Sequence, residues 1–173
     1  MKIRGSIHLG GHSRSLVLFP LPGESLDRLF LKLAACVFFF EKEPIVDSGP
    51  KHPALLGQDY TPDLLVTDEA GGVGLWIECG KTTLNKLGKI SRRFHQARIL
   101  MLIGEPHEAR QMSEGLKAEE IGRVEVWGFA PGEFSRWKHL VAEQNEIIGE
   151  ATETSMNLVI NEQTFMTDLE RFL

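Results

Sequence analysis

The hydrophobic pattern of the first forty residues predicts a β-hairpin followed by a helix. Residues 2–8 and 14–19 are two runs of β-type residues separated by a glycine-containing turn. From Leu26 onward, apolar residues recur at helical spacing. The stretch 34–40 is apolar on all sides, which predicts that the last turns of this helix are buried inside the domain.

The rest of the chain alternates between strand-like and helix-like segments. Proline and glycine are frequent in residues 44–61, which predicts a long loop. The pattern then predicts paired strands at 63–67 and 73–78, a helix at about 83–96, a covered strand at 99–103, a helix from 106, a strand at 124–129, a helix from 132 to about 146 and a strand at 157–160. This order favours one α/β (α+β) domain over residues 1–173, with a mixed central sheet flanked by helices.

Composition narrows the class of protein. A chain of 173 residues can build one well-buried core. No apolar run reaches the roughly 18 residues that a membrane span needs, and the N-terminus leads into a strand pattern and not a signal peptide. The two cysteines, Cys36 and Cys79, are consistent with a reducing compartment and no disulfide framework. We therefore expect a cytoplasmic protein without a membrane partner.

Charge is unevenly distributed along the chain. The formal net charge of −5 argues against a protein that coats duplex nucleic acid through a basic face. Residues 81–98, however, contain six basic residues and no acid. Within this segment Lys86, Lys89 and Arg93 follow helical spacing and share one face, where a lysine could neutralise a phosphate. A solvated helix surface is the simpler explanation of the same face.

Three acidic residues could carry chemistry. Asp63 begins one strand of the predicted pair and Glu78 ends the other, so a hairpin would place their carboxylates side by side. Two carboxylates together with waters and phosphate oxygens suit Mg²⁺, and such an ion can activate water at a phosphoryl group. Glu24 is expected in the first turn of the first long helix, where it could also simply interact with the helix dipole.

The order of these residues resembles a known signature. Pro62-Asp63 followed fifteen residues later by Glu78 resembles the PD-(D/E)XK nuclease motif, and the surrounding chain is similar to the YaeQ family. The matching segments are the N-terminal hairpin, Pro22-Gly23-Glu24-Ser25 with Arg28 and Leu33-Ala34, Trp76-Ile77-Glu78-Cys79-Gly80, and Val126-Trp127.

The resemblance implies a restriction-endonuclease-like core, made of a helix, three strands, a second helix and a further strand. It also implies that Asp63 and Glu78 are metal ligands and that Glu24 is a helix-borne acid beside them. The motif lysine is missing, because Gly80 occupies its position and Lys81 would point to the opposite face of a strand. The resemblance suggests a lysine on the next helix instead, with Lys89 as first choice and Lys86 as second.

These residues predict a nuclease-like phosphodiester hydrolase that depends on Mg²⁺ or Mn²⁺, and they leave its substrate undefined. Nucleic acid is the partner that this activity suggests. The alternative is a catalytically inactive nuclease-fold protein that acts as an adaptor or regulator and binds a protein partner. The acidic net charge and the missing lysine favour this alternative. A third hypothesis is a nuclease whose protein partner supplies the nucleic-acid surface. The choice between DNA and RNA and the oligomeric state stay open.

Overall fold

A computed structural model describes all 173 residues of the chain, with ten strands, four α-helices and two short 3₁₀ helices. The elements follow one another in the order β1 (Ile3–Leu9), β2 (His12–Leu18), α1 (Leu26–Phe38), η1 (Phe40–Lys42), β3 (Ile45–Val46), η2 (Pro53–Leu55), β4 (Leu64–Thr67), β5 (Val73–Cys79), α2 (Leu84–Arg93), β6 (Arg98–Ile103), α3 (Pro106–Ala118), β7 (Val124–Phe129), α4 (Glu133–Leu140), β8 (Gln144–Ala151), β9 (Ser155–Ile160) and β10 (Gln163–Arg171).

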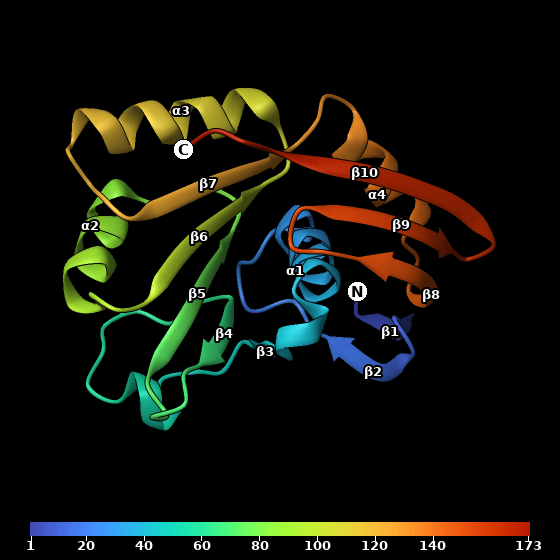
Figure 1. Cartoon of the computed structure of the whole chain (residues 1–173), viewed down its shortest axis with the longest axis horizontal. Coiled ribbons are helices and arrows are strands. Elements are labelled where there is room, and N and C mark those ends of the chain that lie inside the picture. Colours follow the sequence, from blue (N-terminus) through green and yellow to red (C-terminus); the bar gives the residue numbers. More distant parts are fainter.

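All ten strands belong to one mixed sheet. Their order is β2-β1-β8-β9-β10-β7-β6-β5-β4-β3. The pairs β1–β8, β5–β6 and β6–β7 are parallel, and the other neighbours are antiparallel. The sheet curves until it is nearly closed, and α1 lies inside the curve (Figure 1).

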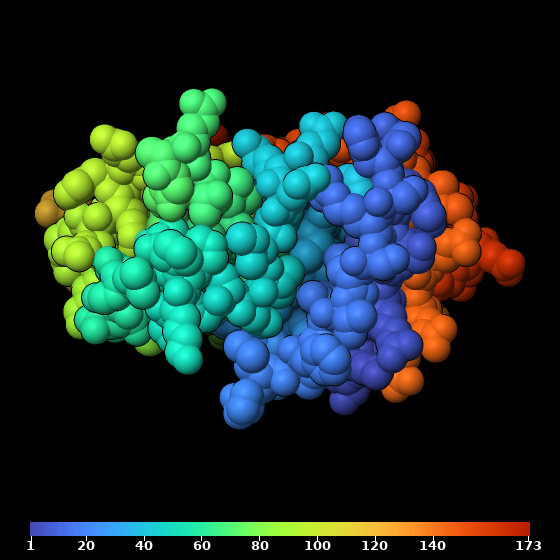
Figure 2. Space-filling model, turned by 90° about the horizontal axis from the view of Figure 1, so that it is seen from below, coloured from blue at the N-terminus to red at the C-terminus, as the bar shows by residue number.

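Helix α1 is the central element of the larger apolar core. It begins after Ser25, whose side chain accepts a hydrogen bond from the backbone N–H of Arg28. From Leu29 to Phe38 every residue is buried, because β5, β6, β9 and α4 all contact the helix. The one charged residue in this stretch is Lys32, which is completely buried. Figure 2 shows that the N-terminal hairpin and the chain between α1 and β4 form the middle of the face that is seen from below.

A second, smaller core lies on the opposite face of the central strands. Residues of α2 and α3 pack there against the outward-facing side chains of β5, β6 and β7, with Trp76 completely buried among them. The strands β5 and β6 are therefore covered on both faces, which explains their nearly continuous apolar sequence.

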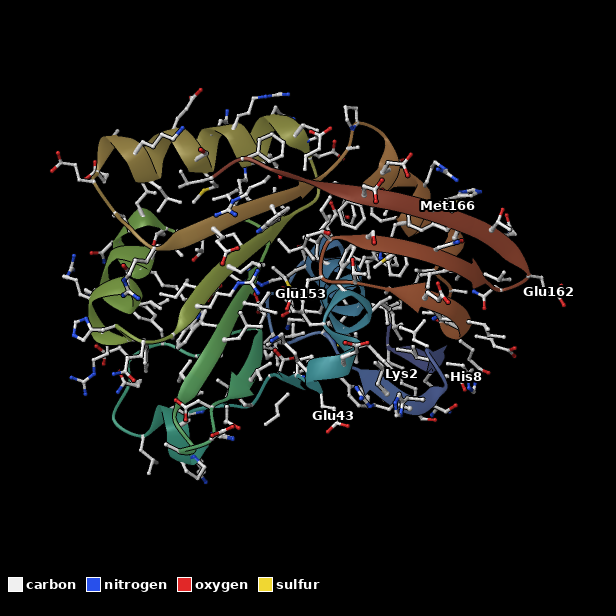
Figure 3. The ribbon with its side chains drawn as sticks, viewed as in Figure 1. Lys2, His8, Glu43, Glu153, Glu162 and Met166 are labelled. Carbon is white, nitrogen blue, oxygen red and sulfur yellow. The ribbon has the colours of Figure 1, made fainter.

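An ion-pair network connects the two halves of the sheet. The guanidinium of Arg98 on β6 binds Glu125 on β7 at 2.6 Å and Glu153 at 2.7 Å, and Lys42 lies 3.6 Å from Glu153. Glu153 belongs to the turn between β8 and β9 and lies between the two halves of the molecule (Figure 3). The network therefore links elements that are far apart in the sequence.

Most of the expected elements are present, and the mixed α+β architecture is confirmed. The N-terminal hairpin, the paired strands at β4 and β5, and the strand β7 lie where the hydrophobic pattern predicts them. No helix is long and apolar enough to cross a membrane.

The C-terminal part of the chain corrects the prediction. The helix expected from 132 to about 146 ends at Leu140, and residues from Gln144 onward form β8. The strand β10 was not expected either. In β8 buried and exposed positions alternate in its first half, which is the period of a strand and not of a helix.

Candidate functional site

The carboxylates of Asp63 and Glu78 lie together at one end of the β4–β5 hairpin. Antiparallel pairing of Leu64 with Ile77 places the residue before β4 beside the last residues of β5. The backbone N–H of Asp63 donates to the Ile77 carbonyl at 3.1 Å, and Asp63 Oδ2 accepts from the Cys79 N–H at 2.7 Å. Both side chains are buried. The expected proximity of these two acids is confirmed.

Arg28 joins the two carboxylates through a single nitrogen. Its Nη2 donates to Asp63 Oδ2 at 2.6 Å and to Glu78 Oε2 at 3.1 Å, and its Nε donates to Asp63 Oδ1 at 3.2 Å. Two carboxylate oxygens thus converge on one point, which is occupied by a cationic nitrogen. The Arg28 side chain remains 24% exposed, so the site is open to solvent on this side.

Lys32, one turn further along α1, binds a second group of acids. Its ammonium lies 2.5 Å from Glu24 Oε2, 2.7 Å from Asp47 Oδ1 and 3.7 Å from Asp63 Oδ1. Burial lowers the pKa of Lys32, but the hydrogen bonds to Asp47 and Glu24 outweigh this effect, and the pKa is raised overall. Lys32 therefore stays charged and holds three carboxylates around itself.

The position of Glu24 differs from the sequence prediction. Glu24 precedes the N-cap Ser25 and lies in the loop before α1, and not in the first helical turn. Its N–H donates to the Leu21 carbonyl at 2.9 Å, which turns the chain at this point. As a result, its side chain points along α1 toward Lys32 and reaches the carboxylate cluster through that residue.

The second oxygen of Glu78 is bound by two donors. Trp76 Nε1 donates to Glu78 Oε1 at 2.8 Å, and Lys86 Nζ lies 2.9 Å from the same oxygen. Lys86 comes from the first turn of α2, whose N-cap Thr83 accepts from the Lys86 N–H. Burial raises the pKa of Glu78, and the nearby Lys86 opposes this effect without cancelling it.

Lys89 lies outside this group. Its ammonium forms no ion pair and is 5.9 Å from the ring centroid of Tyr60. Among the residues predicted from sequence, Asp63 and Glu78 bind the same Arg28 nitrogen, and Lys86 contacts Glu78. Glu24 joins this group through Lys32. The structure does not place Lys89 against a carboxylate.

The donor atoms of the cluster are suited to a hard cation. Oxygens of Glu24, Asp47 and Asp63 lie within 4.8 Å of one another, and carboxylate oxygens are the ligands that Mg²⁺ and Mn²⁺ prefer. Glu24 Oε1 is buried and has no hydrogen-bond partner, so one acceptor of the cluster is unused. Arg28 and Lys32 neutralise the negative charge of these carboxylates. A metal ion would therefore have to replace the contacts of at least one of them.

Three residues of the site were not assigned a role from sequence: Arg28, Lys32 and Asp47. A usable signal exists for Lys32, because a single lysine in a helix that is otherwise apolar on all sides must have buried acidic partners. Arg28 stands one helical turn before it on the same face. Asp47 lies in the loop after α1, with a positive φ of 50°, and nothing in the sequence distinguishes it from other loop acids.

Comparisons with known proteins identify the family and the fold of this chain. The fold and the carboxylate site define a mixed α+β protein with a buried acidic cluster between α1 and the β4–β5 hairpin. The model of the family described as YaeQ protein matches residues 12–169, so the chain belongs to the YaeQ family. No curated protein matches this chain in sequence.

Two solved structures have the same fold over nearly their whole length. The YaeQ protein from Xanthomonas axonopodis pv. citri superposes with a TM-score of 0.72 at 15% identity, covering 98% of this chain and 96% of that one. The YaeQ protein from Pseudomonas syringae gives a TM-score of 0.73 at 14% identity, with 99% and 94% covered. At this identity the likeness shows the fold alone.

Proposed function

We propose that this chain is a Mg²⁺- or Mn²⁺-dependent phosphodiester hydrolase of the PD-(D/E)XK type that acts on nucleic acid. The observation that best supports this proposal is that the carboxylates of Asp63 and Glu78 both contact one nitrogen of Arg28. Their oxygens therefore converge on a single point. The succession α1, β3, β4, β5, α2, β6 supports the proposal, because a helix, three strands, a helix and a strand is the core that the motif implies.

The side chains suggest a division of roles. Asp63 and Glu78 would hold the ion, and Glu24 would assist from the neighbouring group of acids. When bound, the ion would activate a water molecule and stabilise charge on the phosphoryl group. Lys86 is the better candidate for the catalytic cation, because it already lies 2.9 Å from Glu78. Arg28 is partly exposed and could turn from the carboxylates to a substrate phosphate.

Short single-stranded DNA and RNA incubated with the protein and Mg²⁺ or Mn²⁺ test the proposal directly. We expect cleavage by the wild-type chain and none by Glu78→Gln. The matched control is Glu125→Gln, since Glu125 also accepts from a tryptophan, Trp127, and also binds a cationic side chain, Arg98, away from the site. Cleavage that is absent from the wild type, or that is equal in both variants, would refute the assignment.

A second candidate function is that of a catalytically inactive adaptor with the nuclease fold, which binds another protein. The observation that favours it is the presence of Arg28 and Lys32 among the carboxylates, where they neutralise charge without an ion. Calorimetry with Mn²⁺ distinguishes the two functions. Binding that is lost in Asp63→Asn supports the hydrolase, whereas no heat of binding to the wild-type chain supports the adaptor.

A further inference from the structure

A hollow of about 400 Å³ lies beside the carboxylate site, between the loop before β4 and the last turns of α2. This volume is within the range of small-ligand pockets, roughly 300–1,000 Å³. Its walls include Tyr60, Trp76, Lys89, Arg92, Arg93 and Phe94. They combine basic side chains with aromatic rings.

The basic side chains of the hollow have no acidic partner. Lys89, Arg92 and Arg93 are exposed, and none of them forms an ion pair with a carboxylate. Asp59 also lines the hollow but does not bind them. The α2 helix carries no acidic residue to balance these charges. Three uncompensated cations around one concavity make it attractive to an anion.

Aromatic rings supply the remaining walls. Tyr60 and Phe94 are half-buried, and the Phe94 ring lies 5.2 Å from the fully buried ring of Trp76. The ammonium groups of Lys86 and Lys89 lie 5.6 and 5.9 Å from the Tyr60 ring centroid, so Tyr60 helps to fix their positions. A ligand in the hollow therefore meets ring surface and positive charge together.

The hollow and the carboxylate site share Trp76, and Lys86 connects them. Trp76 contributes to the hollow and donates to Glu78 through its indole nitrogen at 2.8 Å. Lys86 contacts both the Tyr60 ring and Glu78. A nucleic-acid strand that places one phosphate at Glu78 can therefore place a neighbouring nucleotide in the hollow.

We propose that this hollow binds one nucleotide of a single-stranded nucleic acid, with a backbone phosphate on Lys89 and Arg93 and the base against Phe94 and Tyr60. An unpaired base is required, because only an unstacked base exposes its face to an aromatic side chain. The acidic net charge of the whole chain also disfavours binding along a duplex. The inference deepens the proposed function by naming its substrate class, but binding does not depend on cleavage.

Fluorescence anisotropy of a labelled ten-nucleotide single strand, measured in EDTA at low salt, tests binding alone. Separate titrations with oligo-dT and oligo-U distinguish DNA from RNA. The test variant is Lys89→Gln/Arg93→Gln, and its matched control is Arg4→Gln/Lys117→Gln, which also removes one exposed arginine and one exposed lysine without an ion pair. Phe94→Leu tests the aromatic contact, and thermal unfolding shows that each variant is folded.

The proposal predicts that Lys89→Gln/Arg93→Gln (the hollow variant) binds the single strand roughly tenfold more weakly than the wild type. The control Arg4→Gln/Lys117→Gln should bind as the wild type does. The proposal also predicts a smaller salt dependence for the hollow variant, since each phosphate contact on a single strand contributes about 0.7 to the log–log slope. Phe94→Leu is expected to weaken binding by roughly fivefold or more, as for the loss of one stacked base. Equal binding by the hollow variant and its control, or no binding of either strand to the wild type, overturns the proposal. Binding without cleavage in Mn²⁺ would leave it intact and refute the hydrolase.

Discussion

The ammonium of Lys32 has no solvent exposure and lies 2.5 Å from the carboxylate of Glu24, a residue just outside the N-terminus of the same helix. The contact spans eight residues and forms because the chain turns before Ser25. A buried ammonium is costly unless it is paired and hydrogen-bonded. Lys32 therefore connects the geometry of the loop before α1 to the stability of the whole carboxylate cluster.

Removal of the Lys32 charge is expected to destabilise the fold strongly. Lys32→Met leaves Glu24 and Asp47 without their cation, and breaking a buried pair on one side costs about 3–5 kcal/mol. Urea denaturation should show this loss in the free energy of unfolding. The triple variant Lys32→Met/Glu24→Gln/Asp47→Asn, which also removes the stranded charges, should recover at least half of it. Equal stability of the single variant and the wild type would contradict this role of Lys32.

Arg28 is expected to compete with a divalent ion for the carboxylates. Its Nη2 occupies the point on which oxygens of Asp63 and Glu78 converge. Arg28→Gln should therefore bind Mn²⁺ about tenfold more tightly in calorimetry, a gain of about 1.4 kcal/mol. The same variant should melt below the wild type in EDTA and regain stability as Mn²⁺ is added.

The control for Arg28 is Arg136→Gln, because Arg136 is exposed and its one ion pair is with Glu133 in its own helix. Its Mn²⁺ affinity should equal that of the wild type. An unchanged affinity in Arg28→Gln would show that the guanidinium and the ion do not share a position.

Part of this site follows from local sequence and part does not. The pairing of Asp63 with Glu78 could be predicted, because both residues belong to one hairpin whose register follows from its apolar strands and its turn. The contact between Lys32 and Asp47 could not, since it depends on how α1 sits against the loop that follows it. Lys86 and Lys89 share a helix face in the sequence, and only the placement of α2 shows that Lys86 is the one beside Glu78.

The fold was predictable to a similar extent. The N-terminal hairpin and β7 have clear apolar patterns between turn residues, and they were located correctly. The hairpin of β9 and β10 was missed because its turn is formed by Asn161 and Glu162, both with positive φ, in place of the usual Asn-Gly. The parallel pairing of β1 with β8 joins residues about 140 positions apart, and no local pattern contains that information.

Replacement of Gly149 in β8 by alanine is expected to destabilise the fold. Its φ of +147° is rarely adopted by residues with a side chain, and an added Cβ would lie 2.2 Å from the Asn157 carbonyl oxygen in β9. Gly149→Ala should lower the free energy of unfolding by about 3 kcal/mol, measured by urea denaturation. Gly122→Ala is the matched control, because that position has open space around it and an ordinary φ. A loss of the same size in both variants would contradict the explanation.

The ionisation of Glu78 is expected to reduce stability at neutral pH. Burial raises the pKa of Glu78 in the folded chain, so the folded state holds this proton more tightly than the unfolded state. Between the two pKa values stability falls as the pH rises, and above both the full cost is present. In EDTA, Glu78→Gln should therefore have a higher Tm than the wild type at pH 7.5. The difference in Tm should vanish near pH 4. A Tm of Glu78→Gln below that of the wild type at pH 7.5 would show that the charged form of Glu78 stabilises the fold, contrary to this prediction.

Lys86 and Lys89 are expected to affect different kinetic constants if the chain cleaves single strands. Lys86 contacts Glu78, so Lys86→Gln should lower kcat by about 100-fold, comparable to the loss of one donor to a transition-state oxyanion. Lys89 contacts no carboxylate and lines the basic hollow, so Lys89→Gln should mainly raise KM, by about fivefold. Steady-state kinetics with a labelled oligonucleotide and Mn²⁺ separate the two effects. An equal loss of kcat in the two variants would contradict this division. It would show that both lysines of the α2 face contribute to catalysis, and not Lys86 alone.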